Sequence, residues 1–223
     1  QSLAKTDLKV RVDTLDDGLP TIAAHAIQGR VASVSSLTRD IFDVRIALDA
    51  PIEYYAGQYA NLTIPGVAAS RSYSFATAPL NAGSDELSFH IRLIPNGEVS
   101  SWFAAGDRIG ESIGIDGPYG IFRLRQADVS IICIAGGSGM APIKAMLEHG
   151  SEQGLSRSVV YLYGGRTQAD LYNDDVIDNL TNAWAGPIRF LPVLSEEPQD
   201  SGWTGARGFV TDFIKRIDEF KVA

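Results

Sequence analysis

The stretch from 130 to 149 constrains the fold of this chain more than any other. Ile131–Ala135 is a short, mostly β-branched apolar run that stops at the glycine-rich turn Gly136–Gly139, a pattern typical of a fully buried strand that enters a tight turn. Pro142 suits the first turn of a helix, and the apolar residues after it recur at helical spacing. A strand, a glycine turn and a helix in succession direct free backbone N–H groups and the positive end of a helix dipole at one point, which favours phosphate.

The glycine turn alone leaves two interpretations open. It lacks the spaced glycines of a dinucleotide-binding first turn, and no Lys-Ser or Lys-Thr pair closes it as in a phosphate-binding loop. A glycine-rich connection also lets a helix pack closely on its sheet without any ligand. Other motifs in the chain are needed to distinguish a nucleotide-binding turn from a turn that serves only helix packing.

Length, charge and cysteine content limit the class of protein. A chain of 223 residues, 45% hydrophobic and 21% charged, has room for one large domain or two small ones, and we predict two. The formal net charge of −8 argues against nucleic acid as a partner, and no apolar stretch or signal peptide pattern indicates a membrane. The single cysteine, Cys133, lies in the apolar run, so we predict an inert core thiol, no internal disulfide, a reducing cytoplasmic location and no metal site.

Two different patterns of apolar residues divide the chain near residues 123–128. The first part holds six short runs separated by turn residues, which predict an antiparallel barrel or sandwich, with one helical turn starting at Val99. Those runs are 29–34, 41–48, 59–64, 72–76, 86–93 and 108–115. The second part alternates strands with helices, which predicts a parallel sheet covered on both faces. Its predicted strands are 131–135, 158–163 and 188–194, and its predicted helices are 141–149, 174–183 and 210–217.

A second candidate binding motif is Arg71-Ser72-Tyr73-Ser74. On one extended strand Arg71 and Tyr73 point to the same face, so a cation and an aromatic ring lie side by side. Such a pair can hold a phosphate and stack on a flat heterocycle, while Ser74 brings a hydroxyl and an N–H near a ring edge. Taken alone, the four residues favour an ordinary barrel strand with Tyr73 as packing and Arg71 as a surface charge.

Taken in order, the motifs resemble the ferredoxin-NADP reductase superfamily, in particular the reductase components of bacterial multicomponent oxygenases. The resemblance covers the chain from about His25 onward. The motifs that carry it are Gly57–Tyr59, Arg71–Ser74, Phe89–Arg92 with Gly97–Ser100, Gly117–Gly120, Gly136–Pro142, and Tyr163–Arg166 with Asp170-Leu171. The resemblance implies an antiparallel flavin-binding β-barrel followed by a parallel-sheet α/β nucleotide-binding domain. We therefore predict a barrel domain over 25–125 and a nucleotide-binding domain over 126–223.

The resemblance implies that the barrel holds a flavin. In the family the arginine of the Arg71–Ser74 motif holds the flavin phosphate, the tyrosine stacks on the isoalloxazine, and the serine lies near the reactive nitrogen. Tyr73 and Ser74 are therefore the two predicted catalytic residues. The predicted flavin contacts are Arg71, Ser72, Tyr73, Ser74, His90, Ile91, Arg92, Gly97, Val99 and Ser100. FAD is favoured over FMN because the apparent domain order, iron–sulfur tail first and flavin domain second, resembles the FAD-bearing branch.

The resemblance also assigns the glycine turn to the pyrophosphate of a pyridine nucleotide. The predicted NAD contacts are Gly137, Ser138, Gly139, Met140, Gly165, Arg166, Ser195 and Glu196. Glu196 and Glu197 would repel a 2′-phosphate and accept from ribose hydroxyls, which favours NADH over NADPH. A solvated loop is the alternative for these two glutamates, and Arg166 is compatible with either nucleotide.

Both ends of the chain bear on the predicted function. Residues 1–8 resemble the stretch after the last cluster-ligating cysteine of a plant-type [2Fe–2S] ferredoxin domain, so residues 1–24 are expected to be the tail of such a domain or a linker. The cluster itself is then expected in a domain outside this chain. The sequence stops at Ala223, before the Cys-Gly-Pro-Pro type segment that lines the nicotinamide site in the family, so we expect an incomplete nucleotide-binding domain and looser nucleotide binding.

The predicted function is that of an NADH-dependent flavin reductase. It would take a hydride from NADH onto FAD and pass electrons singly to a [2Fe–2S] centre, in a ferredoxin domain or protein, and on to an oxygenase component. One alternative is an electron-transfer subunit for another acceptor, such as a dehydrogenase partner or a haem protein. Another is a non-catalytic module that binds NAD or ADP-ribose without flavin, against which the Arg71–Ser74 motif argues.

Overall fold

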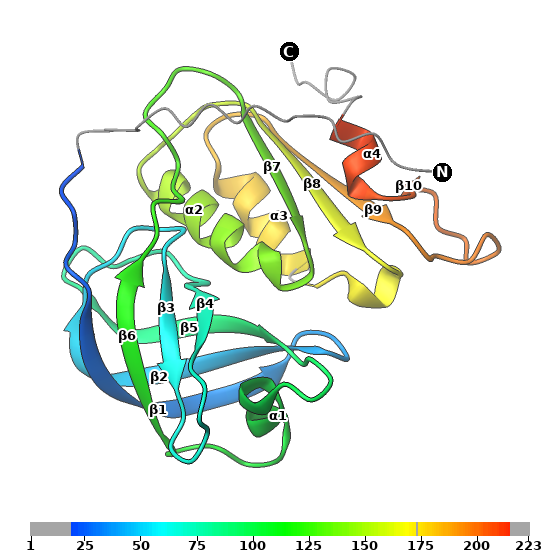
Figure 1. Cartoon of the computed structure of the whole chain (residues 1–223). Helices are drawn as coiled ribbons and strands as arrows, with labels where there is room; N and C mark the ends of the chain where they lie inside the picture. The colour runs from blue at the N-terminus through cyan, green and yellow to red at the C-terminus, as the bar shows by residue number, and fades with distance from the viewer. Residues whose placement is uncertain (1–18, 173, 215–223) are drawn as a thin grey trace, which may run out of the picture.

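The computed structural model describes residues 19–172 and 174–214 of the chain. Figure 1 shows a β-barrel with a parallel sheet and its helices above it. Most of the predicted ferredoxin tail or linker over 1–24 and the last residues of the predicted helix 210–217 lie outside the described residues.

The barrel is a six-stranded antiparallel sheet in the order β4-β3-β6-β1-β2-β5. Its strands are β1 (His25–Ser36), β2 (Ile41–Ile52), β3 (Tyr59–Thr63), β4 (Arg71–Ser74), β5 (Ser84–Arg92) and β6 (Ser112–Tyr119). The sheet curls until its two edge strands meet at one antiparallel bridge between Phe75 and Phe89. A short helix, α1 (Glu98–Ala104), follows β5 where a helical turn was predicted. The predicted antiparallel barrel is confirmed.

Alternation of side chains along each strand fills the barrel. In β3, Ala60 and Leu62 are fully buried, whereas their neighbours Tyr59, Asn61 and Thr63 face the other way. At the seam between the edge strands the rings of Phe75 and Phe89 pack with their centroids 5.6 Å apart. Each large side chain that is fully buried contributes roughly 1.5–3 kcal/mol relative to an exposed one, so this core is enough to keep the sheet curled.

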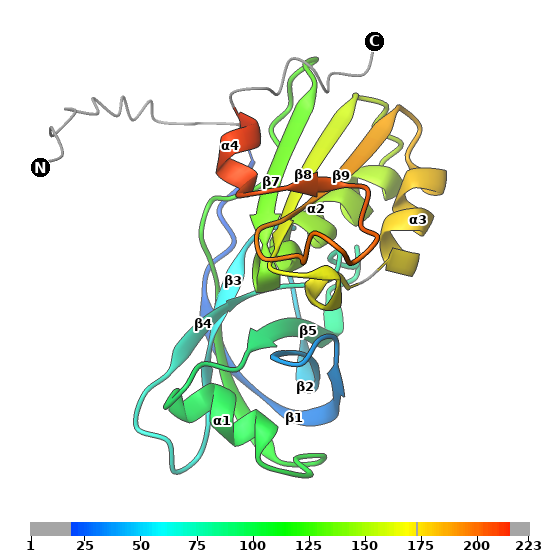
Figure 2. The ribbon, with the colours of Figure 1, turned by 90° about the vertical axis from the view of Figure 1, so that its right-hand side faces the viewer.

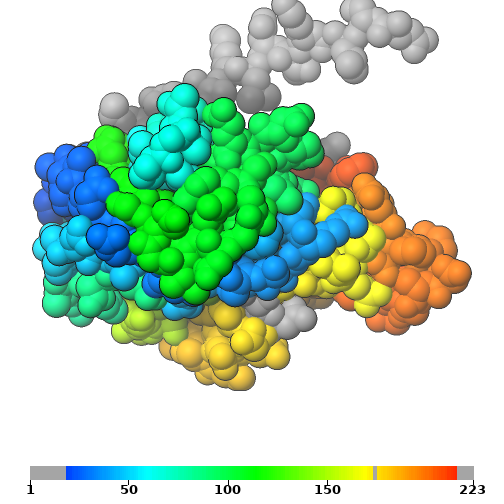
Figure 3. Space-filling view, turned by 90° about the horizontal axis from the view of Figure 1, so that it is seen from below, coloured from blue at the N-terminus to red at the C-terminus, as the bar shows by residue number. Residues whose placement is uncertain are grey.

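The second half of the chain is a parallel sheet in the order β10-β9-β8-β7. Its elements are β7 (Ile131–Gly136), η1 (Gly137–Gly139), α2 (Met140–Glu152), β8 (Val159–Gly165), η2 (Gln168–Asp170), α3 (Asp174–Ala183), β9 (Ile188–Leu194), β10 (Ala206–Arg207) and α4 (Val210–Ile214). Helices α2 and α3 lie on one face of the sheet and α4 on the other (Figure 2). The connection between β9 and β10 projects to one side of the molecule (Figure 3). The predicted parallel α/β arrangement is confirmed.

Strand β7 corrects one expectation from the sequence. It is an edge strand of the described sheet, and among the described residues only one of its faces is well covered: Ile131 and Cys133 are buried, but Ile132 is 46% and Ile134 is 39% exposed. The expectation of a fully buried strand was therefore wrong. Helix α4 packs on β8 instead. A short apolar run has no periodicity that distinguishes an edge strand from a central one.

The thiol of Cys133 is buried in the core between the sheet and α2. Burial raises its pKa to about 12, so it stays protonated and unreactive near neutral pH, as predicted for a core thiol. In the described ranges no group of three or more His, Cys, Asp or Glu side chains is placed to hold a metal ion. None of the described helices has the length and apolar character needed to cross a membrane.

A buried lysine joins the two halves of the molecule. Lys144 on α2 donates from Nζ to the carbonyl of Ala76, just beyond β4, at 2.9 Å and pairs with Glu148 at 2.7 Å. Its side chain is 12% exposed. A charged donor to a buried carbonyl is worth more than an exposed ion pair, so this bond stabilises the domain junction.

Replacing Lys144 with methionine is expected to lower the free energy of unfolding by about 1–3 kcal/mol, because the buried carbonyl of Ala76 loses its donor. Urea denaturation checks this. Glu148→Gln is the control: it removes the ion pair but keeps the bond to Ala76, so a loss below about 1 kcal/mol is expected. Equal losses in the two variants would contradict a stabilising role for the bond between the domains.

Candidate functional site

The Arg71–Ser74 motif forms β4 at the open edge of the barrel. The register pairs Tyr73 with Ala60 and Arg71 with Leu62. The side chains of Arg71 and Tyr73 therefore lie on the same face as those of Ala60 and Leu62, which is the face that lines the barrel. Because β4 is an edge strand, this face is incompletely covered there: Tyr73 is half-buried and Arg71 is exposed. Burial raises the pKa of Tyr73 and the nearby Arg71 charge opposes that rise. The structure thus confirms that the cation and the ring share one face.

The donors of β4 fit a planar ligand that carries phosphate. Among the described residues, the Arg71 guanidinium donates to a single acceptor, the carbonyl of Ser70, at 2.8 Å. Ser72 lies on the opposite face, where its Oγ donates to Asn61 at 2.7 Å. A guanidinium with spare donors beside a half-buried ring suits both the phosphate and the flat ring system of FAD.

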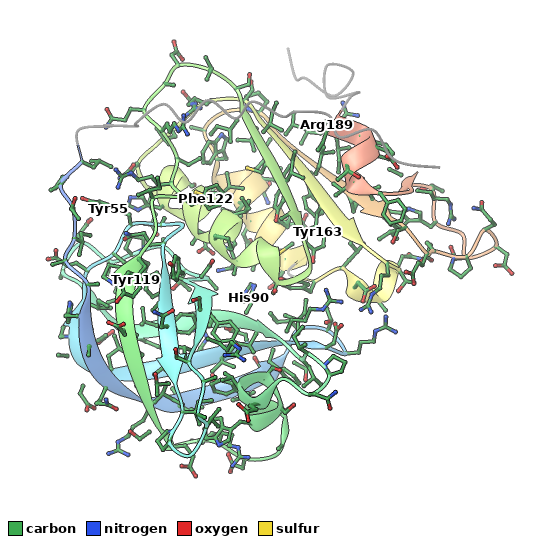
Figure 4. The ribbon with its side chains drawn as sticks, viewed as in Figure 1. Tyr55, His90, Tyr119, Phe122, Tyr163 and Arg189 are labelled. Atoms are coloured by element: carbon green, nitrogen blue, oxygen red, sulfur yellow. The ribbon has the colours of Figure 1, made fainter. Side chains whose placement is uncertain are left out.

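The predicted flavin residues on strand β5, His90, Ile91 and Arg92, do not all point to the same face. Ile91 is fully buried in the barrel core, so only its backbone can reach a ligand. His90 and Arg92 point to the opposite face, toward the parallel sheet, and Figure 4 shows His90 in the space between the two halves. His90 Nδ1 lies 3.3 Å from the hydroxyl of Tyr172, and Arg92 pairs with Asp40. The structure does not bring these two side chains to Arg71.

At the start of α1, the groups that a ligand could reach are backbone N–H groups rather than side chains. Gly97 is the N-cap, and a Cβ there would lie 2.7 Å from Ser100 Oγ and 3.1 Å from the Ile94 carbonyl, so this position requires glycine. Ser100 Oγ accepts from the Ile94 N–H at 3.1 Å and donates to the Gly97 carbonyl at 3.2 Å. Val99 is buried in the barrel core. A phosphate at these three predicted positions would meet the first backbone N–H groups of the helix.

The predicted NAD residues gather at the carboxyl ends of β7, β8 and β9. One cleft of about 290 Å³ is lined there by Gly137, Gly165, Arg166 and Ser195 together with residues of the barrel. In open parallel sheets the crevice beyond the carboxyl ends of the strands is where nucleotides bind. The observed placement therefore matches the geometry of a nucleotide site.

The remaining predicted NAD residues lie around this cleft but do not line it. Ser138 and Gly139 form η1, which leads directly into α2. Met140 is fully buried in the domain core, and its backbone N–H donates to the Gly137 carbonyl. Glu196 is exposed, and its N–H donates to the Arg166 carbonyl at 2.7 Å. Glu197 accepts from the backbone N–H and the side chain of Gln168, so it ties two loops together.

Two tyrosines hold the carbonyl of Gly137 at the start of the glycine loop. Tyr163 donates to it at 3.2 Å and Tyr172 at 2.9 Å. Burial raises the pKa of both hydroxyls, so both are protonated donors near neutral pH. Since the Tyr172 proton is used by Gly137, the 3.3 Å contact with His90 places a proton on His90 Nδ1. The start of η1 is thereby held by two tyrosines of the parallel-sheet domain, one of which also contacts His90 of the barrel.

Two functional candidates at the cleft were not identified from the sequence as site residues. Tyr172 directly follows the Asp170-Leu171 segment, so an aromatic residue next to that motif was the available signal. Asp40 lies in the turn between β1 and β2 and lines the cleft from the barrel side. Nothing local in the sequence marks Asp40, because its partners come from β5 and from the end of β8.

Asp170 anchors the arginine that lines the cleft. It accepts from Arg166 Nε at 3.1 Å and Nη2 at 2.7 Å, and from the backbone N–H groups of Arg166 and Thr167 at 3.0 Å each. Partial burial acts to raise the pKa of Asp170, but the hydrogen bonds from Arg166 and Thr167 outweigh it and lower that pKa. The carboxylate is therefore ionised and fixes the guanidinium.

Comparison with known proteins agrees with this architecture. Residues 28–124 match the family described as oxidoreductase FAD-binding domain, and residues 133–221 match the oxidoreductase NAD-binding domain. The chain is 39% identical over 216 residues to the electron transfer component of xylene/toluene monooxygenase from Pseudomonas putida, a match that covers 96% of this chain and 60% of that protein. It is 32% identical to the reductase component of phenol 2-monooxygenase from Pseudomonas sp. strain CF600, covering 94% of this chain and 59% of that protein. The chain thus spans about 60% of the length of these relatives.

Solved structures show the same arrangement. A ferredoxin reductase in carbazole 1,9a-dioxygenase, 25% identical, superposes with a TM-score of 0.78 and covers 92% of this chain and 60% of its own. An Amycolatopsis cytochrome P450 reductase, 30% identical, superposes with a TM-score of 0.79 and covers 89% of this chain and 60% of its own. The chain therefore belongs to the oxidoreductases that carry an FAD-binding domain followed by an NAD-binding domain, and it has the fold of the ferredoxin reductases.

Proposed function

We propose that this chain is the flavin and nucleotide module of an NADH-dependent reductase that supplies electrons to an oxygenase component. The observation that carries the proposal is that β5 connects the two candidate sites. Phe89 bridges to Phe75, which directly follows the Arg71–Ser74 motif, and the next residue, His90, contacts the tyrosine that holds Gly137. A ligand at the barrel edge and one at the glycine loop would therefore share a strand.

The residues of this chain supply binding and orientation. FAD, when bound, accepts a hydride from a nicotinamide and releases electrons singly. Arg71 would hold the FAD phosphate, Tyr73 would cover one face of the ring and exclude water, and Ser74 would present its hydroxyl and N–H at the ring edge. The first N–H groups of η1 would hold the pyrophosphate of NADH.

We infer NADH rather than NADPH from the charges around the cleft. Arg166 already donates to two carboxylates, Asp40 and Asp170, so only part of its donor set remains for a phosphate. Glu196 is exposed at the end of β9 beside Ser195, where a carboxylate disfavours a 2′-phosphate. FAD rather than FMN remains the proposed flavin, since the matched family is described as FAD-binding.

The proposed electron acceptors lie outside this chain. The relatives named above are components of xylene/toluene and phenol monooxygenases, so we infer a [2Fe–2S] centre in a ferredoxin domain or protein as the immediate acceptor and an oxygenase as the next. A haem protein is a second candidate acceptor, because the similar Amycolatopsis structure is a cytochrome P450 reductase. The buried thiol of Cys133 suits a reducing cytoplasm, the proposed compartment.

An anaerobic absorption spectrum before and after addition of NADH tests the proposal, with the flavin released by heat and identified by chromatography. We expect a yellow protein that contains FAD and bleaches with NADH, and bleaches more slowly with NADPH. A yellow protein that does not bleach would keep the flavin assignment and reject hydride transfer by this chain. A colourless protein that flavin cannot reconstitute would reject the reductase and favour a nucleotide-binding module.

A further inference from the structure

Asp40 is shared by two arginines from the two halves of the molecule. Its Oδ2 accepts from Nε and Nη2 of Arg92, each at 3.2 Å, and from Nη2 of Arg166 at 3.1 Å. Arg92 is the last residue of β5 in the barrel, whereas Arg166 directly follows β8 of the parallel sheet. One carboxylate oxygen therefore joins the two domains at the mouth of the nucleotide cleft, which all three residues line.

The turn between β1 and β2 holds Asp40 in place. Thr38 Oγ1 donates to Asp40 Oδ1 at 3.1 Å and accepts the N–H groups of Asp40 and Ile41 at 3.3 and 3.1 Å. The Asp40 carbonyl accepts from the N–H of Leu93 at 2.7 Å. Partial burial acts to raise the pKa of Asp40, but the Thr38 hydrogen bond and the charges of Arg92 and Arg166 outweigh it and lower that pKa. Asp40 is an ionised and anchored acceptor.

Each arginine keeps one donor for a ligand. Within the part of the chain that the structure describes, Nη1 of Arg92 and Nη1 of Arg166 have no hydrogen-bond partner. A Cβ built on Gly137 would lie 3.4 Å from Arg92 Nη1, so this donor stands beside the glycine loop. Both guanidinium groups donate to the same carboxylate oxygen, so two positive charges lie close together and would repel each other without an anion between them. Asp40 is that anion.

We propose that Asp40 is a positioning residue for the pyrophosphate of the dinucleotide: it holds Arg92 and Arg166 together across the domain boundary, with one donor of each directed at the cleft. The inference rests on the proposed function and adds a residue to it. Without the carboxylate, Arg92 loses the acceptor that holds it beside Arg166, which Asp170 still anchors, and the cleft loses its paired donors. Asp40 acts through the arginines and does not itself contact the nucleotide.

Calorimetric titration of the flavin-loaded protein with ADP-ribose tests this role. ADP-ribose carries the pyrophosphate without the nicotinamide, so binding is measured apart from hydride transfer. Asp40→Asn is expected to raise the Kd for ADP-ribose about tenfold, the low end of the effect of a lost charge-assisted bond, because the site is partly exposed. Glu86→Gln is the matched control. It removes the same charge from the barrel surface, where Glu86 pairs with Arg45, and should leave the Kd unchanged.

Two further measurements separate positioning from a general structural effect. The KM for NADH should rise in parallel with the Kd while kcat and the Kd for FAD stay within about twofold of the wild type. In an Arg166→Gln background the Asp40→Asn substitution should add less than it does alone, because both act through one contact. An unchanged or lower Kd for ADP-ribose in Asp40→Asn overturns the role of Asp40. A wild-type protein that takes up FAD but does not bind ADP-ribose overturns the proposed function and this role with it.

Discussion

Replacing Arg71 with alanine is expected to weaken FAD binding by about 100-fold or more, so that the protein purifies largely without flavin. The guanidinium of Arg71 is exposed at the barrel edge and donates to a single carbonyl in the described structure, that of Ser70. Its other donors are therefore free to bind a phosphate in the fork geometry that only arginine offers. Removal of the side chain costs both the charge and the fixed direction of those donors.

Titration of the flavin-free protein with FAD, followed by the quenching of flavin fluorescence, measures this effect. Arg71→Lys should be intermediate, because it keeps the charge and loses the fork. Arg30→Ala provides a control on β1: Arg30 is also an exposed barrel arginine bonded to one carbonyl, that of Gly110, so its loss should leave the Kd for FAD within about twofold. A wild-type Kd in Arg71→Ala would show that the phosphate lies elsewhere.

The order and type of the elements followed from local patterns in the sequence. The predicted bounds of α3 (Asp174–Ala183) and β9 (Ile188–Leu194) coincide with the observed ones. The pattern of apolar residues that distinguishes a helix from a strand is visible within a segment of about ten residues, so it can be identified from the local sequence. Strand β10, only two residues long, has no periodicity of its own and was missed. It exists because Ala206 and Arg207 pair with the end of β9.

The positions of candidate site residues could be predicted where they depend on one segment of the sequence. They could not be predicted where they depend on contacts between several segments. Strand alternation correctly placed Arg71 and Tyr73 on one face. The same alternation puts His90 and Arg92 opposite Ile91, but which face turns toward the other domain is decided only when the barrel closes. Asp40 meets Arg166 across 126 residues of sequence, and no local pattern carries such a contact.

His90 is expected to make the stability of the protein depend on pH between about 4 and 6.5. Burial, opposed by the charge of Asp43 and assisted by that of Lys144, lowers the pKa of His90 from 6.5 to about 4. The unfolded chain takes up a proton at a pH where the folded protein does not, so the unfolded state binds more protons throughout this range. The full contribution is therefore present above pH 6.5 and is lost as the pH falls, by about 3 kcal/mol at pH 4.

Urea denaturation at pH 7.5 and pH 4.5 of the wild type and of His90→Gln measures this contribution as the difference between their two pH dependences. Carboxylates such as Asp40 and Asp170 also lose their stabilising contacts in acid, but they are present in both proteins and cancel in the difference. Glutamine keeps a donor within reach of the Tyr172 hydroxyl, so the substitution removes the titration while the contact that supports Gly137 can persist. An equally steep loss in His90→Gln would place the titration on other groups and make His90 a packing residue of the domain boundary.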